Sequence, residues 1–223
     1  MLRVSVDIGG TFTDMVITAP DGAAAMFKSP STYGALSDGV LNCFRKAAKA
    51  RGVSLEALLA DVDTIIHGTT ATTNALLTRS GVKTGMLTTK GFRDIIELRR
   101  GMRVGISPYN LKVKFPEPLV PRSRRIGIDE RVDSDGEVVT PLDERQVENA
   151  VRRLVADGCE AIAICFLYSY VKPQHERRAA EIARALAPDA FVTTSYETIP
   201  ISRELERFNT TVVGAYVGSI FSS

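Results

Sequence analysis

The sequence predicts a mixed α/β protein, and three observations along its 223 residues support that fold class. Short β-branched runs, such as 62–66 and 84–88, alternate with longer segments in which apolar residues recur at the helical period, such as 36–51. The run 161–167 is almost wholly apolar, which is typical of a strand covered on both faces. The length allows one large domain, or one and a half average ones, with ample core.

Composition narrows the classes of function. The net charge of +2 implies no general attraction to nucleic acid or membranes. No apolar run approaches the roughly 18 residues that span a bilayer, and the chain opens on a strand rather than a signal peptide. The three cysteines form no C-x-x-C pair, which favours reduced thiols. We therefore expect a cytoplasmic protein without a nucleic-acid or membrane partner.

The first 90 residues predict the core of the fold. Their order is three strands, helix, strand, helix, strand, which is the order of the ribonuclease-H-like core of actin-like ATPases and sugar kinases. We expect residues 1–90 to form such a core, with a mixed sheet and a phosphate loop. The expected elements are strands through 4–6, 15–17 and 23–28, a helix at 36–51 ended by Gly52, a helical turn capped by Ser54, a strand at 62–66, a helix at 70–78 ended by Gly81, and a strand at 84–88.

The remaining chain divides into three predicted parts. Residues 91–140 form a basic, proline-rich insertion followed by a hairpin between 125 and 140, and we expect the insertion to pack on other protein or lie near an anionic ligand. Residues 141–200 form a second α/β stretch, and 201–223 begin a helix that leads to an absent C-terminal part. The expected elements of the second stretch are an amphipathic helix that follows residues 141–143 and runs to about 157, a helix at 174–186, and strands at 161–167 and 191–194.

The opening stretch VSVDIGGTFTDMV is predicted to be a strand, a tight glycine turn and a second strand. Gly9 and Gly10 allow positive φ and a close approach of the backbone to a ligand. Thr11, Thr13 and the turn amides can donate to phosphate oxygens, while Asp7 can hold a magnesium ion directly or through water. The pattern is neither a P-loop nor a dinucleotide-binding fingerprint. The alternative is an ordinary β-hairpin with a Gly-Gly turn.

A second loop, His67-Gly68-Thr69-Thr70, follows a strand and opens a helix. Gly68 permits close backbone approach, and Thr69 and Thr70 with the helix N-terminal amides make an anion site. The alternative is that one threonine merely caps the helix while His67 is hydrogen-bonded in a core. His175, at the start of a later helix, is expected to have a capping role.

Several motifs together resemble one protein family. VSVDIGGTFTDMV, HGTTATTNALL, GVKTGMLTTKGFRDIIEL, CFLYSYVKPQHE and ERFNTTVVGAYV are similar, in this order, to the N-terminal region of the hydantoinase/oxoprolinase family. The family includes N-methylhydantoinase A-type proteins, 5-oxoprolinase, and ATP-dependent acetone and acetophenone carboxylase subunits. The resemblance covers essentially the whole chain.

The resemblance implies an actin-like ATPase lobe that uses ATP and Mg²⁺. It implies ring-opening hydrolysis of a cyclic amide, of the hydantoinase/5-oxoprolinase type, or carboxylation of a ketone, through a phosphorylated intermediate. Asp7 would bind magnesium through water, and Asp14 would be a second carboxylate near the metal or substrate. The glycines and threonines at 9, 10, 11 and 13 would cradle the ATP phosphates. Residues His67, Gly68, Thr69 and Thr70 would form the family's other signature loop beside the same cleft.

Members of this family are two to three times longer than this chain, and the later part supplies the second phosphate loop and the adenosine-binding segment. The resemblance therefore implies a fragment or a split subunit that is inactive alone. It would act with the rest of its own chain or a second subunit, in a homo- or hetero-oligomer. Two alternatives stay open: an actin-like sugar or acyl kinase, and a non-catalytic subunit of a carboxylase or hydantoinase complex.

Overall fold

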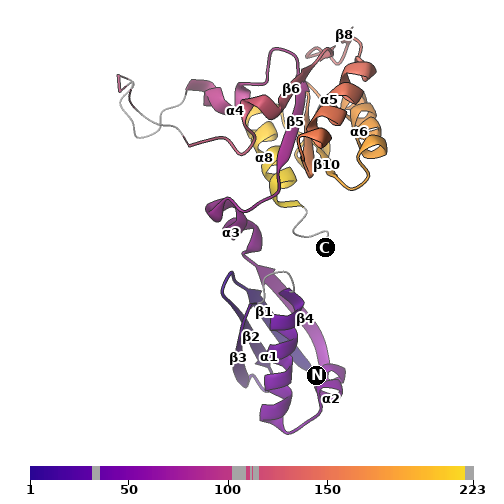
Figure 1. The fold of residues 1–223 in the computed structure, drawn as a ribbon. Helices are drawn as coiled ribbons and strands as arrows, with labels where there is room; N and C mark the ends of the chain where they lie inside the picture. The colour runs from indigo at the N-terminus through magenta and orange to yellow at the C-terminus, as the bar shows by residue number, and fades with distance from the viewer. Residues whose placement is uncertain (32–35, 102–108, 111, 113–115, 219–223) are drawn as a thin grey trace. The chain divides into compact units, whose positions relative to one another are not determined.

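The structure is a computed structural model that describes residues 1–31, 36–101, 109–110, 112 and 116–218 (Figure 1). It divides into two compact units, Met1–Ser80 and Gly81–Ser223. Each unit has its own sheet and its own apolar core. Within the described residues, no helix combines the length and hydropathy that crossing a bilayer requires.

Unit 1 is built on a four-stranded sheet with the order β3-β2-β1-β4. The first three strands form an antiparallel meander, and β4 runs parallel to β1. Residues of β1 are alternately buried and exposed, because one face of the sheet packs against α1. The elements are β1 (Leu2–Ile8), β2 (Phe12–Thr18), β3 (Ala24–Pro30), α1 (Leu36–Arg51), α2 (Leu55–Ala60), β4 (Val62–Thr69) and α3 (Ala71–Thr78).

Two of the helix-end residues predicted from the sequence, Gly52 and Ser54, are confirmed, and a third, Gly81, is not. Ser54 caps α2 by accepting the Ala57 N–H at 3.1 Å, and Gly52 follows α1 with a φ of +68°. However, α3 ends in a left-handed residue at Arg79, with φ of 54°, and not at Gly81. Gly81 has a packing role instead, since an added Cβ would lie 2.3 Å from the ring of Tyr216.

Unit 2 is a three-layer α/β arrangement around a parallel sheet with the order β10-β9-β5-β6. Helices α5 and α6 cover one face of the sheet, and α8 with α4 covers the other (Figure 1). A small hairpin of β7 and β8 precedes α5. The elements are β5 (Thr84–Thr89), α4 (Ile95–Leu98), the 3-10 turns η1 (Arg99–Gly101) and η2 (Arg122–Arg124), β6 (Arg125–Ile128), β7 (Arg131–Val132), β8 (Val138–Thr140), α5 (Glu144–Ala156), β9 (Ala161–Cys165), α6 (Gln174–Leu186), β10 (Phe191–Thr194), α7 (Ser195–Thr198) and α8 (Glu204–Gly218).

The mixed α/β class is confirmed, but two boundaries differ from the sequence expectation. Strand β5 pairs with β6 and β9 in unit 2, so the first compact unit ends at residue 80 rather than at 90. All six residues of β5 are buried, and the helices of unit 2 provide cover on both of its faces.

The segment 125–140 is not a single hairpin, because β6 runs parallel to β5 and only β7 pairs with β8. Much of the basic insertion (102–108, 111 and 113–115) and the end of the last predicted helix lie outside the described residues.

Candidate functional site

The two loops singled out in the sequence lie on neighbouring strands of unit 1. In the strand register, Asp7 of β1 is paired with Asp14 of β2 on one side and with Gly68 of β4 on the other. Because β1 and β4 are parallel, the Gly9 turn and residues 67–70 lie at the same end of the sheet. Strand β4 extends through Thr69, so His67, Gly68 and Thr69 are strand residues rather than the loop that the sequence predicts. For residues 67–70 we keep the term second loop. We call the row Asp14, Asp7 and Gly68, together with these two loops, the loop site.

Asp7 is exposed at the loop site. It lies between the buried residues Val6 and Ile8, so its side chain is on the sheet face opposite to the α1 core. Among the residues that the structure describes, its carboxylate makes no hydrogen bond or ion pair. A free, solvent-accessible carboxylate at this position is available to a cation.

The glycine turn is tight, but not for the reason that the sequence suggested. Neither Gly9 nor Gly10 has a positive φ. The Gly9 N–H donates to the Phe12 carbonyl at 2.9 Å, and a Cβ on Gly9 would lie 3.1 Å from that same oxygen. Glycine is therefore favoured here by the closeness of the two chain segments.

Thr13 supports the turn from inside. Its side chain is buried, and its hydroxyl lies 3.1 Å from the Ser31 hydroxyl. Ser31 in turn donates its hydroxyl to the Gly9 carbonyl at 2.9 Å and its N–H to the Thr11 carbonyl at 2.9 Å. In this arrangement the exposed Thr11 hydroxyl is better placed than Thr13 to meet a ligand.

Ser31, which directly follows β3, was not among the site residues predicted from the sequence. Its proximity to the turn follows from the pairing of β2 with β3, which places the two hydroxyls side by side across 18 residues of sequence. No local pattern signals such a contact.

Asp14 is partly neutralised. Lys28 of β3 donates to both of its carboxylate oxygens, at 3.0 and 3.2 Å, and the same ammonium lies 4.7 Å above the ring of Phe12. Of the two predicted carboxylates, Asp7 is thus the one without a competing cation.

In the second loop, Thr69 rather than Thr70 makes the capping contact. The Thr69 hydroxyl donates to the Ile8 carbonyl at 3.1 Å and accepts the Ala71 N–H at 3.1 Å, whereas Thr70 makes no side-chain cap bond. Thr69 therefore ties the end of β1 to the start of α3. His67 is exposed on β4, so the alternative of a hydrogen-bonded core histidine does not hold.

These residues fit a magnesium-bound polyphosphate. Magnesium prefers one or two carboxylates plus phosphate oxygens and water over a cage of protein ligands. No group of three or more His, Cys, Asp or Glu side chains suited to a metal occurs in the described part of the chain, and the loop site offers the single free carboxylate of Asp7. The bare glycine turn and the Thr11 hydroxyl lie directly after it in the chain.

Unit 2 contains a buried polar network at the carboxyl ends of its parallel strands. Glu130 is buried and accepts from Thr89, and His175 Nδ1 lies 2.8 Å from its other oxygen. The Leu167 N–H donates to the Thr89 hydroxyl at 2.9 Å. The partner of His175 is therefore a buried carboxylate, which corrects the expected capping role.

A second buried carboxylate, Glu176, holds the end of β9 from the other side. It accepts from the Phe166 N–H at 2.7 Å and from the Ser195 hydroxyl at 2.6 Å, and Arg207 donates to Ser195 and to the Phe166 carbonyl. Burial raises the pKa of Glu176 to about 7, against the effect of these donors. The network fixes the β9 terminus and has no counterpart among the predicted site residues.

Comparison with known proteins gives consistent matches to a family profile, to two relatives and to a solved structure. The profile described as hydantoinase/oxoprolinase N-terminal region matches residues 3–187. The caprolactamase alpha subunit of Pseudomonas jessenii is 38% identical over 98% of this chain and 31% of its own length, and the acetophenone carboxylase gamma subunit of Aromatoleum aromaticum is 38% identical over 96% and 31%. The crystal structure of the ATP-dependent caprolactamase from Pseudomonas jessenii has a TM-score of 0.87 over 99% of this chain and 32% of that one. The chain thus spans about a third of the length of these relatives.

Proposed function

The chain belongs to the hydantoinase/oxoprolinase family and corresponds to the N-terminal region of that family. From this premise we propose that its loop site binds the phosphates of Mg-ATP. The enzyme containing it would activate the carbonyl oxygen of a cyclic amide for ring opening, or of a ketone for carboxylation. Relatives at 38% identity carry the names of a lactamase and a ketone carboxylase, so the family supports ATP-dependent amide or ketone chemistry.

One observation carries this proposal: the register places Asp7 next to Gly68, so the Gly9 turn and the second loop lie at one end of the sheet with an unpaired carboxylate between them. A simple β-hairpin would explain the Gly9 turn alone, but it would not explain the second glycine–threonine loop beside it. A glycine turn, an exposed threonine hydroxyl and a free carboxylate at one end of the sheet are groups that polyphosphate and magnesium can use.

Each residue would have a distinct part in this function. Asp7 would hold magnesium through water, and the turn amides with Thr11 would fix the phosphate oxygens, because positioning and charge stabilisation dominate phosphoryl transfer. Thr13 and Ser31 would keep the turn rigid, and Thr69 would keep the second loop in register with it. His67 is exposed on β4, but its register partner is the buried Val6, so its side chain is on the sheet face opposite to that of Asp7. We therefore propose no contact between His67 and the metal. Bound Mg-ATP would supply the phosphoryl group that turns the carbonyl-derived oxygen into a leaving group.

The test is substrate-dependent ATP hydrolysis by the complete enzyme carrying Asp7→Asn. We expect kcat to fall by about 100-fold or more, since electrostatic groups at a reacting phosphate are worth several kcal/mol. The matched control is Asp63→Asn, an exposed carboxylate on the neighbouring strand β4, which should leave turnover within twofold. Undiminished turnover in the Asp7 variant would remove the role proposed for it. Release of a ring-opened or carboxylated product, rather than a phosphoester, separates this function from that of a sugar or acyl kinase.

A further inference from the structure

Unit 2 carries a basic cleft that the proposed function does not use. It has a volume of about 790 Å³, which falls within the usual range of small-molecule sites. Its described lining residues come from the β5–α4 loop, the segment around β6, and helix α5. The ionisable ones are Lys90, Arg93, Arg122, Arg125 and Arg153, with Asp94 as the acid.

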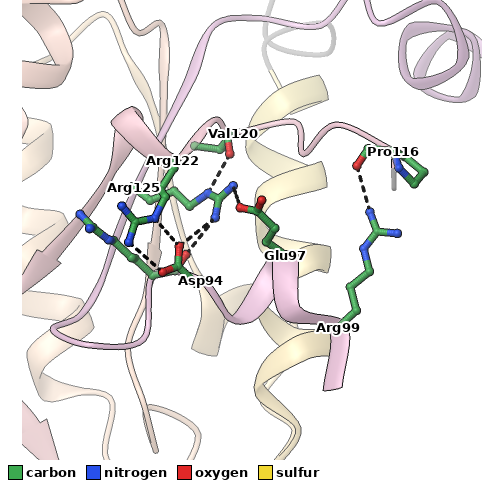
Figure 2. Close-up of polar contacts among 8 residues, drawn as sticks. Asp94, Glu97, Arg99, Pro116, Val120, Arg122 and Arg125 are labelled. Carbon is green, nitrogen blue, oxygen red and sulfur yellow. Dashed lines mark hydrogen bonds and ion pairs between the residues drawn. The ribbon is translucent and has the colours of Figure 1, made fainter. Parts of the chain in front are cut away.

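One wall of the basic cleft is rigid. The Arg125 side chain is 1% exposed; its guanidinium donates to the Val120 carbonyl at 2.9 Å and to Glu97 at 2.8 Å (Figure 2). Arg122 places two guanidinium nitrogens on the two oxygens of Asp94, at 3.0 and 3.1 Å. These pairs neutralise one another, so they set the shape of the cleft more than its charge.

Two other arginines provide the uncompensated charge. Among the described residues, the Arg93 guanidinium makes no hydrogen bond or ion pair. Arg153 has a single contact of 3.5 Å to the Ser123 carbonyl, which is longer than a normal hydrogen bond. Lys90, by contrast, is balanced by Asp129 at 2.8 Å. The cleft therefore offers the Arg93 guanidinium, which has no such partner, and the Arg153 guanidinium, which has only one long contact to a neutral carbonyl.

The shape of the basic cleft also depends on a glycine in its wall, Gly127, which has no side chain. Gly127 of β6 lines it, and a Cβ at that position would lie 3.1 Å from the Cα of Lys90. Glycine thus lets the β5–α4 loop approach the strand while adding no atoms to the cleft itself.

We propose that the basic cleft binds a compact small-molecule dianion, either a dicarboxylate or a phosphomonoester, through Arg93 and Arg153. Planar guanidinium groups recognise carboxylate and phosphate oxygens bidentately, and two guanidinium groups without an acidic partner match two negative charges. The unusually basic segment between Lys90 and Arg125 then has a specific use: part of it builds the wall, and part of it meets the ligand.

The test is calorimetric titration of the 223-residue chain with succinate and, separately, with inorganic phosphate, at constant ionic strength and without magnesium. We expect saturable binding of at least one probe, and the tighter probe identifies the ligand class. Arg93→Gln and Arg153→Gln should each weaken binding about tenfold or more, as expected for the loss of charge-assisted hydrogen bonds. The control Arg152→Gln changes the net charge equally at an exposed neighbour on α5 that does not line the cleft, and should stay within twofold.

The variant Asp7→Asn separates this site from the loop site. Binding of the probe should be unchanged in that variant, so failure of the proposed function leaves this result intact. Three results would overturn the inference: no saturable binding of either probe, equal weakening by Arg152→Gln, or loss of binding in Asp7→Asn.

Discussion

At the scale of single residues, Ser31 is the side chain on which the shape of the glycine turn depends. Ser31→Ala removes the hydroxyl contacts to Thr13 and to the Gly9 carbonyl and leaves a buried threonine hydroxyl without that partner. We expect a loss of about 1–2 kcal/mol of local stability. Amide hydrogen exchange at residues 9–13 should accelerate about tenfold, whereas Ser37→Ala on the exposed surface of α1 should not change it. Equal protection in both variants would show that the turn holds its shape without Ser31.

Glu176 gives a pH-dependent prediction at the same scale. Its pKa is raised by burial to about 7 from about 4.5, so the folded state binds a proton that the unfolded state has released between these values. The stability that this proton contributes is present below pH 4.5 and is lost as the pH rises to about 7. The loss is on the order of 3 kcal/mol, and Glu176→Gln, which cannot ionise, should not show it.

The measurement is urea unfolding at pH 5 and pH 8, followed by tyrosine fluorescence. This signal reports on unit 2, because five of the six tyrosines lie after residue 80. The stability of the wild type minus that of Glu176→Gln should fall by about 3 kcal/mol across this interval, whatever its value at pH 5. Glu181→Gln, an exposed residue on the same helix, is the control. A constant difference would contradict a protonated Glu176.

The site residues that the sequence revealed lie close together along the chain, whereas those it did not reveal make contacts between distant segments. Asp7 and its glycine turn are recognisable because carboxylate, bare backbone and hydroxyls lie within a few positions of one another. Ser31 acts on the same turn across the sheet, and the partner of His175 is Glu130, 45 residues away. Contacts of this kind depend on strand pairing and sheet edges, which no local spacing encodes.

At the scale of elements, local periodicity predicted most helices and strands but not the partners of every strand. Strand β5 was recognisable from its β-branched and apolar residues, yet its assignment to a sheet depended on which helices could cover both of its faces. Strand β6 was read into a hairpin because the turn at 133–136 follows it closely, although its hydrogen bonds go to β5. The residue composition of a segment identifies it as a strand, whereas the helices that pack on its two faces determine which sheet it joins.

The contact between Gly81 and α8 gives a prediction at this scale. Gly81→Ala would place a methyl group 2.5 Å from the Tyr216 carbonyl as well as against its ring, and backbone cannot yield cheaply. We expect a loss of about 1–3 kcal/mol in the unfolding free energy of unit 2, typical of overpacking. Gly214→Ala on the same helix is the matched comparison, because it meets nothing within 4 Å and should stabilise the helix by about 0.5–1 kcal/mol. Equal effects of the two variants on urea unfolding would show that α8 does not pack tightly at Gly81.

At the scale of the whole molecule, the proposed loop site would account for phosphate binding but not for the recognition of a complete nucleotide. The described residues of unit 1 provide the turn, the carboxylate and the second loop from one sheet, while the family resemblance assigns the adenosine-binding segment to later sequence. We therefore expect calorimetry of the 223-residue chain with Mg-ATP to show millimolar or unmeasurable affinity, and the complete enzyme to bind at least 100-fold more tightly. Asp7→Asn should abolish the tight binding of the complete enzyme. Micromolar, saturable binding by the 223-residue chain alone would mean that these residues already enclose the nucleotide, and the adenosine contacts would then have to be sought within them.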